Sequence, residues 1–113
     1  MWDTEGDQID IDSIVEGFYW ACAMGRKKVV ELLLNHPRLK QKDMSKGKYG
    51  CTPFFSACTR GQTDVIKLLL NHPRTKGIDF KNERNRLGEG PLEIAQRSGY
   101  LEIVAILTEY GFS

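Results

Sequence analysis

Cysteine and histidine are the residues of this chain best suited to nucleophilic or metal-binding chemistry, and four of them recur in pairs. Cys22 and Cys58 are 36 residues apart, and so are His36 and His72. A zinc site normally takes four ligands, and the sequence has no Cys-x-x-Cys or His-x-x-x-His pattern. We therefore expect no metal site. The paired cysteines are interpreted as small core residues, and the paired histidines as helix-end residues that interact with free backbone carbonyls.

Catalysis is not indicated by the remaining candidates. A cysteine nucleophile needs an oriented base and a group that stabilises the oxyanion, and no histidine lies near the third cysteine, Cys51, in the sequence. A glycine-rich phosphate loop of recognised spacing is also missing, and Glu102 and Glu109 are interpreted as exposed carboxylates on a helix face. We predict a protein that is not an enzyme and that uses no cofactor.

A longer segment of the sequence is repeated at the same spacing as the cysteine and histidine pairs. Residues 29–38 read VVELLLNHPR, and residues 65–74 read VIKLLLNHPR, 36 positions later. Self-similarity at such a period indicates stacked units, each of which buries its apolar face against the next. Function is then expected on the surface of a stack of repeats.

Each repeat is predicted to contain two short helices and a long connection. In the middle repeat, Thr52 and Pro53 are typical of a helix start, and Gly61 is typical of a helix end. Thr63 is expected to cap a second helix, in which apolar residues recur at three- and four-residue spacing. Pro73 is expected to stop that helix.

The flanking repeats share these landmarks. Ser13 and Glu16 have the spacing of a capping box at the start of the first repeat, and Pro91 in the third repeat matches Pro53. Small residues recur in all three repeats, as Ala21, Ala57 and Ala95 and as Gly25, Gly61 and Gly99. The space between the layers is expected to be filled by aliphatic side chains of the second helices, namely Leu32, Leu33, Leu68, Leu69, Ile106 and Leu107.

Together these landmarks resemble the ankyrin repeat, whose unit of about 33 residues opens with Thr-Pro-Leu-His-x-Ala. Here that opening reads TPFFSA at residues 52–57, and the resemblance covers about residues 13–111. It implies an all-α fold, an ankyrin-like solenoid of stacked helix-turn-helix repeats joined by long finger loops. We expect residues 1–12 to form an acidic, frayed segment and residues 13–113 to form the repeat domain, with repeats at about 13–49, 50–87 and 88–113.

Two departures from the family pattern affect the expected structure. The histidine of the opening is replaced by Tyr19, Phe55 and Glu93 in the three repeats, so its hydrogen bonds to neighbouring turns should be missing. The steps of 36 and 38 residues between equivalent glycines exceed the usual period, and the extra length is expected in the connections, roughly residues 38–49 and 74–87. Loops of this length are expected to depart from regular β-hairpin geometry.

Charge is unevenly distributed, although the net charge is only +1. Residues 1–16 hold six acidic and no basic residues, whereas residues 38–48 carry a net charge of +4 and residues 74–86 a net charge of +3. The plainest interpretation is an acidic tail and solvated loops. No apolar run approaches the roughly 20 residues of a membrane span, and the acidic start is unlike a signal peptide. Three cysteines without disulfide-scaffold spacing favour a reducing compartment, so we expect an intracellular, cytoplasmic protein, with a nuclear location as the alternative.

The family resemblance implies a protein–protein interaction module with a concave surface, made of finger tips and the exposed side of the first helices. Cations such as Arg60 and Arg86 would make this face positive, so we expect a partner with an acidic peptide or acidic protein surface. Most aromatic residues of the first helices are interpreted as core filling. Tyr19 and Phe55 take the position that is partly exposed in the family, so the alternative is that they are partner anchors. The candidate partner-binding residues are Tyr19, Ala23, Met24, Lys48, Tyr49, Cys51, Phe55, Thr59, Arg60, Arg86, Leu87, Glu89, Arg97 and Ser98.

Two other interpretations remain open. In the first, the chain is a structural segment or capping fragment of a longer ankyrin array and has no ligand of its own. The last helix bears on this interpretation, because Thr108 and Glu109 give it a partly polar outer face while Ile103 and Val104 leave apolar surface to cover. In the second, the basic fingers bind nucleic acid, which we rank last because no aromatic residues are interleaved with the cations. We expect no membrane association and a monomeric protein.

Overall fold

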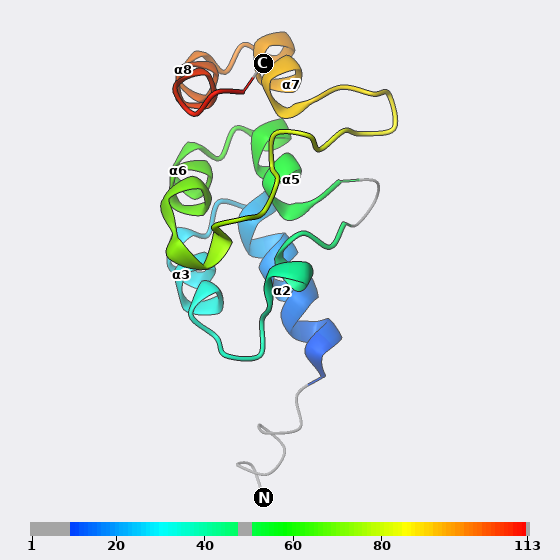
Figure 1. Ribbon diagram of the computed structural model, residues 1–113, viewed down its shortest axis with the longest axis vertical. Helices are drawn as coiled ribbons and strands as arrows, with labels where there is room; N and C mark the ends of the chain where they lie inside the picture. Colours follow the sequence, from blue (N-terminus) through cyan, green and yellow to red (C-terminus); the bar gives the residue numbers. More distant parts are fainter. Residues whose placement is uncertain (1–9, 48–50, 113) are drawn as a thin grey trace, which may run out of the picture.

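The computed structural model describes residues 10–47 and 51–112. Within them the chain forms seven α-helices and a 3-10 helix: α2 (Ile11–Ala23), α3 (Lys27–Leu34), α4 (Gln41–Met44), α5 (Pro53–Arg60), α6 (Thr63–Asn71), η1 (Pro73–Thr75), α7 (Pro91–Ser98) and α8 (Leu101–Glu109). Three helix pairs, α2–α3, α5–α6 and α7–α8, are stacked along one direction (Figure 1). The first helices of the pairs form one layer of the stack, and the second helices form the other. The all-α, stacked-repeat architecture predicted from the sequence is confirmed.

Local sequence determines where the helices of the middle repeat begin and end. Thr52 caps α5, because its Oγ1 accepts a hydrogen bond of 3.1 Å from a backbone N–H in the first turn. Pro53 occupies the first helical position, where an N–H is not needed. Gly61 ends α5 with a φ of 74°, a left-handed conformation that glycine adopts without steric cost. These predictions are confirmed, but Thr63 is the first residue of α6, and the cap position is taken by Gln62.

The first helix is longer than its counterparts. α2 has 13 residues, whereas α5 and α7 have 8 each. Its cap is Asp10, whose side chain accepts a hydrogen bond from the backbone N–H of Asp12. The capping box predicted at Ser13 and Glu16 is therefore wrong, because the helix begins before both residues.

The two connections are built from short helical turns. In the first connection, α4 packs against α2, and Leu39 and Met44 are buried there with exposed fractions of 0% and 2%. In the second connection, η1 follows α6 directly, and α4 and η1 are in contact. The extra residues of each repeat thus lie in the connections, as predicted, and the described parts of both connections contain no β-hairpin.

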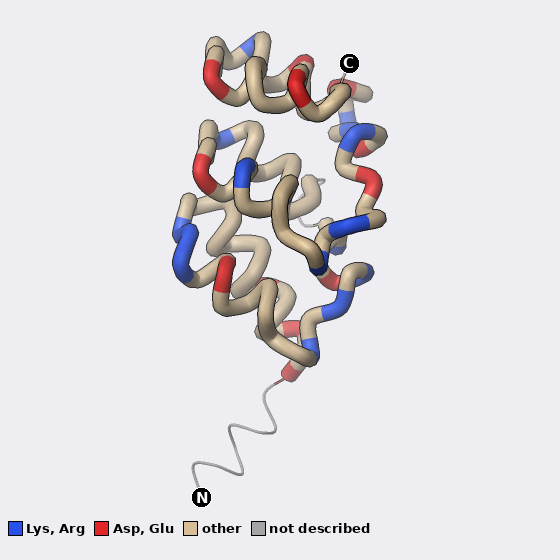
Figure 2. The backbone as a smooth tube through the Cα atoms, turned by 60° about the vertical axis from the view of Figure 1, so that its left-hand side comes forward, with Lys and Arg blue, Asp and Glu red and all other residues tan. Residues whose placement is uncertain are grey.

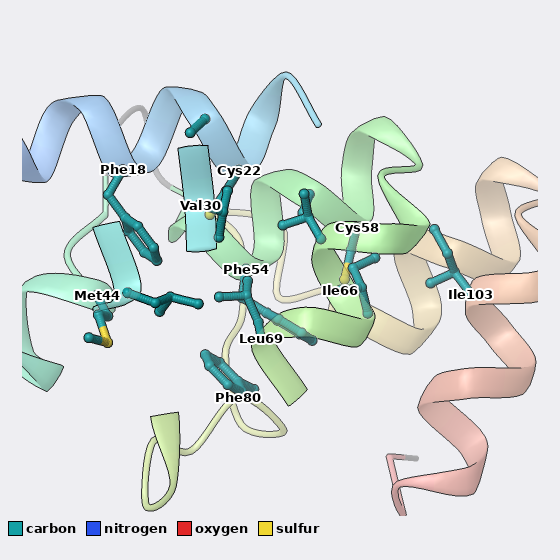
Figure 3. Close-up of a cluster of buried hydrophobic side chains, with 14 of the residues drawn as sticks. Phe18, Cys22, Val30, Met44, Phe54, Cys58, Ile66, Leu69, Phe80 and Ile103 are labelled. Carbon is teal, nitrogen blue, oxygen red and sulfur yellow. The ribbon is translucent and has the colours of Figure 1, made fainter. Parts of the chain in front are cut away.

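The core continues through the stack from repeat to repeat (Figure 3). Cys22 and Cys58 lie at equivalent positions in it, fully buried and without a disulfide. Burial raises the pKa of both thiols, because a thiolate is poorly solvated in an apolar interior. The interpretation of these two cysteines as small core residues is confirmed.

A group of aromatic rings connects α5, the second connection and the C-terminal end of the described chain. Phe54 on α5 stacks on Phe80 of the second connection, with ring centroids 4.4 Å apart, and on Phe112 near the C-terminus, with centroids 5.8 Å apart. All three side chains are buried. The second connection and the end of the chain are thereby held against the middle repeat.

The aliphatic residues expected between the layers are buried to different extents. Leu69, Ile106 and Leu107 are buried, and Leu33 and Leu68 are half-buried. The prediction for Leu32 is wrong, because its side chain is 73% exposed. Leu32 belongs to the first repeat, and among the described residues no helix pair precedes this repeat to cover it.

One side chain joins the ends of the first two repeats. The guanidinium of Arg74, which follows α6, donates hydrogen bonds of 2.8 Å to the backbone carbonyls of Leu34 and His36 and one of 2.5 Å to that of Leu39. These carbonyls lie at and beyond the end of α3, where a helix leaves acceptors without intrahelical partners. Arg74 therefore closes the end of a helix in the preceding repeat.

The two histidines have a different role from the one predicted. The Nδ1 of His36 accepts a 3.1 Å hydrogen bond from the backbone N–H of Arg38, and the Nδ1 of His72 accepts one of the same length from that of Arg74. The expected interaction of the imidazoles with free carbonyls is wrong, because each ring instead satisfies a donor of the turn that follows its helix.

Candidate protein-interaction surface

The structure separates the predicted partner-binding residues by exposure. The exposed ones are Met24, Thr59, Arg60, Arg86, Leu87, Arg97 and Ser98, and the half-buried ones are Cys51 and Glu89. The buried ones are Tyr19, Ala23 and Phe55. Lys48 and Tyr49 lie outside the described residues.

The exposure expected for the two aromatic anchors is wrong. Tyr19 is 5% exposed and Phe55 is 1% exposed. Phe55 belongs to a run of buried residues that covers all of α5 except its last two residues, since this helix contacts α2, α6 and α7. Large rings at such positions stabilise the stack by removing apolar area from water. Ala23 is fully buried as well, so it offers no surface to a partner.

Arg97 does not contribute an unpaired cation to the surface. Its Nε and Nη2 donate hydrogen bonds of 2.9 Å to the two carboxylate oxygens of Glu89. Glu89 also accepts a 2.9 Å bond from the side chain of Asn85. The hydrogen bonds from Asn85 and Arg97 hold the pKa of Glu89 below its usual range, because they favour the charged carboxylate. This arrangement fixes the last turn of the second connection against α7.

Two of the exposed candidates meet at the ends of neighbouring first helices. The guanidinium Nη1 of Arg60 on α5 lies 3.8 Å from the Sδ of Met24, which follows α2. The Met24 side chain is 53% exposed. The pair therefore presents a cation beside an apolar, adaptable side chain at the edge of the layer formed by the first helices.

Each described acidic residue of the connections accepts a hydrogen bond from a nearby group. Asp43 is 7% exposed, and its Oδ2 accepts a 3.0 Å hydrogen bond from the backbone N–H that precedes α4. Asp79 accepts a 2.6 Å bond from the side chain of Asn82. Glu83 accepts a hydrogen bond from the hydroxyl of Thr52. With Glu89 paired to Arg97, each acidic residue of the described connections is engaged in local structure.

The basic residues of the connections are mostly exposed, and Figure 2 shows Lys and Arg recurring along the backbone of the connections. A hollow of about 440 Å³ is lined by Ile11, Arg38, Lys40, Lys42, Asp43 and Lys46. The predicted site did not include this hollow. Its sequence signal was the net charge of residues 38–48, which is equally compatible with a solvated loop.

Glu83 is the most strongly perturbed carboxyl group of the described chain. Burial raises its pKa to about 7, the bond from Thr52 opposes this shift, and the nearby charge of Asp79 adds to it. Cys51 lies close by and is half-buried. Burial raises the pKa of the Cys51 thiol, although Arg86 acts in the opposite direction. A thiol with a raised pKa is a poor nucleophile at neutral pH, so the geometry offers no activated group here.

Three stacked helix pairs with these landmarks match a family model described as ankyrin repeats in three copies, over residues 18–113. The chain belongs to the ankyrin-repeat family. Ankyrin repeats are generally modules of protein–protein interaction and generally non-catalytic. The search of curated proteins found no match to this ankyrin chain.

Across residues 10–47 and 51–112, no group of three or more His, Cys, Asp or Glu side chains is arranged to hold a metal ion. In the same residues no helix has the length and apolar character needed to cross a membrane.

Proposed function

We propose that this ankyrin-repeat chain binds an acidic segment of a partner protein through its finger side, without catalysis. The finger side comprises the two connections together with the exposed ends of α2, α5 and α7. The observation that supports this proposal most is that each described carboxylate of the connections accepts a local hydrogen bond, while most of the cations there are exposed.

The hollow beside α4 is the part of the finger side best suited to receive carboxylates. Lys42 and Lys46 are exposed on it, and Asp43 is held inward by its bond to the backbone. Arg86 and the 80% exposed Leu87 extend the surface on the second connection. In such an interface the charges mainly govern the association rate and the orientation of the partner, while apolar contacts supply much of the affinity.

A pull-down from lysate of the source cell, read by mass spectrometry, tests the proposal. The wild-type chain is compared with the double variant Lys42→Glu/Lys46→Glu and with the matched control Arg26→Glu/Lys27→Glu. The control has the same change in net charge, at the start of α3. We expect a protein with an acidic segment to bind the wild type and the control and to be lost from the finger variant.

Two outcomes would contradict the proposal. Partners that bind both charge variants equally would place the binding surface elsewhere on the stack. A nucleic acid that is retained in low salt and released steeply as salt rises would indicate the alternative function of the basic fingers.

A further inference from the structure

The ends of α3 and α6 differ in how their backbone carbonyls are satisfied. In the first repeat, Arg74 donates hydrogen bonds to three carbonyls at and beyond the end of α3. The residues equivalent to its three acceptors, 36 positions later in the second repeat, are Leu70, His72 and Thr75. The position of Arg74 itself is taken in the third repeat, 38 residues further on, by Phe112. A phenyl ring donates no N–H, so the third repeat cannot close the end of α6 as Arg74 closes the end of α3.

A hollow of about 480 Å³ lies at the end of α6, and we call it the α6 hollow. The three equivalents of the Arg74 acceptors, Leu70, His72 and Thr75, all line it. Its other sides are formed by residues 76–81 of the second connection and by the turn that follows α8. No group among the described residues donates a hydrogen bond to the carbonyl of Leu70. The volume lies within the range of about 300–1,000 Å³ that is typical of binding pockets.

Part of the lining of the α6 hollow is apolar and rigid. Phe80 and Phe112 line it from the second connection and from the C-terminal turn, and both rings stack on Phe54. Figure 3 shows Phe80 beside Phe54, next to the core of the stack. Leu70 and Ile78 are half-buried and add aliphatic surface to the lining. Rings held in this way favour an apolar occupant, and an aromatic side chain in particular.

Two lysines of the second connection add positive charge to the α6 hollow. Lys76 and Lys81 line it and are exposed, and neither forms an ion pair with a described carboxylate. The Nζ of Lys81 lies 3.1 Å from the position that a Cβ on Gly111 would take, so its ammonium group is next to the C-terminal turn. Among the described residues that line the hollow, Asp79 alone is acidic. The lining therefore keeps an excess of positive charge.

These charges exclude a second arginine as the natural occupant of the α6 hollow. A guanidinium beside Lys76 and Lys81 would be repelled, whereas a carboxylate would be attracted. The occupant is thus expected to combine an apolar body with a nearby carboxylate and to offer an N–H to the carbonyl of Leu70. A peptide segment in which acidic residues flank an aromatic residue has all three groups.

The α6 hollow is a neighbour of the hollow beside α4. Gln41, which lies between Lys40 and Lys42 in the sequence, donates hydrogen bonds to the backbone carbonyls of Arg74 and Lys76. Lys40 and Lys42 line the hollow beside α4, and Lys76 lines the α6 hollow. The contact between α4 and η1 therefore joins the two hollows. A partner segment bound along the cations of the connections meets the α6 hollow there.

We propose that the α6 hollow binds an aromatic side chain of the partner's acidic segment, with a neighbouring carboxylate of that segment at Lys76 and Lys81. This inference rests on the proposed function, because it adds an apolar anchor to the acidic segment that the finger side binds. It also gives the interaction its selectivity. Charge alone would allow the finger side to bind any acidic segment, whereas a buried aromatic anchor distinguishes one segment from another.

Two synthetic peptides with acetylated and amidated ends serve as probes. The first has the sequence EDFDE, and the second, EDSDE, has the same charge but lacks the aromatic ring. Each is titrated into the full chain at low ionic strength, where attraction between charges is least screened, and backbone amide signals are followed by NMR. We expect EDFDE to bind about tenfold more tightly than EDSDE, because part of a phenyl ring is removed from water. Only EDFDE should shift the amide signals of residues 110–112.

Variants of the lining locate the aromatic ring and the carboxylate separately. Ile78→Asn should remove most of the preference for EDFDE and leave the affinity for EDSDE unchanged. Lys76→Glu/Lys81→Glu should weaken the binding of EDFDE by about tenfold or more. The matched control is Arg26→Glu/Lys27→Glu, which has the same change in net charge at the start of α3 and should weaken binding less. Both double variants change exposed residues, so the fold is retained.

The inference and the proposed function fail in different ways. If neither peptide binds, the proposed function fails and the inference fails with it. If both peptides bind with the same dissociation constant, the finger side still binds acidic segments, but the aromatic anchor is overturned. A preference for EDFDE that survives Ile78→Asn would overturn it too. So would EDFDE-specific shifts centred on Thr59 and Arg97, which would place the aromatic ring at the ends of the first helices.

Discussion

At the scale of single residues, Arg74 is the side chain that joins two repeats through hydrogen bonds to three backbone carbonyls. We expect Arg74→Ala to lower the free energy of unfolding by about 1.5–3 kcal/mol. The change removes hydrogen bonds from a charged donor and leaves carbonyls at a helix end without that donor. Urea unfolding at fixed salt measures the change. Arg60→Ala is the control and should alter stability by less than about 0.5 kcal/mol, since Arg60 is exposed. Equal losses in both variants would contradict the role of Arg74.

Glu83 gives the chain a predictable pH dependence. Its pKa is raised to about 7 from an ordinary value of 4.5, so the folded state binds the proton more tightly than the unfolded state. This contribution to stability is complete below pH 4.5 and is lost as the pH rises through 7. We expect the urea midpoint of Glu83→Gln to exceed that of the wild type at pH 8 and to show less decline from pH 5 to pH 8. Glu109→Gln, at an exposed carboxyl group, should retain the wild-type decline, and an identical decline in the Glu83 variant would refute the assignment.

At the scale of elements, the glycines that end α5 and α7 allow a matched comparison. Gly61 and Gly99 have φ values of 74° and 77°, so alanine at either position is strained by about 1–2 kcal/mol. An added methyl group at Gly61 would also lie 2.9 Å from Cζ of the Tyr100 ring, whereas nothing lies within 4 Å of one at Gly99. Gly61→Ala should therefore lower the melting temperature more than Gly99→Ala. Equal decreases would show that the Tyr100 ring moves away without cost.

The helix boundaries of the second and third repeats could be predicted because they are local. A threonine or glycine before proline and a glycine at the end specify them within a few residues of sequence. The start of α2 was missed although its cap, Asp10, is a local signal, because Ser13 and Glu16 offered a second capping pattern slightly later in the chain. Thr63 was mistaken for the cap because threonine is a favoured cap residue, whereas Gln62 takes this position without a side-chain capping hydrogen bond.

The interaction surface was harder to predict than the helices. Burial of Tyr19 and Phe55 depends on how tightly the neighbouring repeats and connections enclose the layer formed by the first helices. In addition, α5 has eight residues and is buried on nearly all sides, so its sequence has no polar face that would indicate its orientation. The pairing of Arg97 with Glu89 joins a helix to a loop whose shape the sequence did not specify. The basic connections could be located from the sequence, because the net charge of a segment is counted without knowing the structure.

At the scale of the whole molecule, the effect of truncating a leucine of a second helix should depend on whether neighbouring helices cover it. Leu69 on α6 is 1% exposed, whereas Leu32 on α3 is 73% exposed. We expect Leu69→Ala to lower the free energy of unfolding by about 2–5 kcal/mol, and Leu32→Ala to change it by less than about 0.5 kcal/mol. Urea titrations of both variants provide the measurement. A comparable loss in Leu32→Ala would show that this side chain is covered in solution.

Residues 29–38 and 65–74 are nearly identical, so the coding sequence offers two similar stretches between which recombination could occur. A crossover between the two stretches of coding sequence would remove 36 residues in frame and yield a protein with two repeats and apparently intact landmarks. The arginine after its first helix pair would then have no earlier helix end to bind, although three carbonyls accept its hydrogen bonds in the present protein. The first two repeats are similar in sequence but cannot replace one another. The second repeat supplies the Arg74 side chain, which binds the end of the helix pair in the repeat before it.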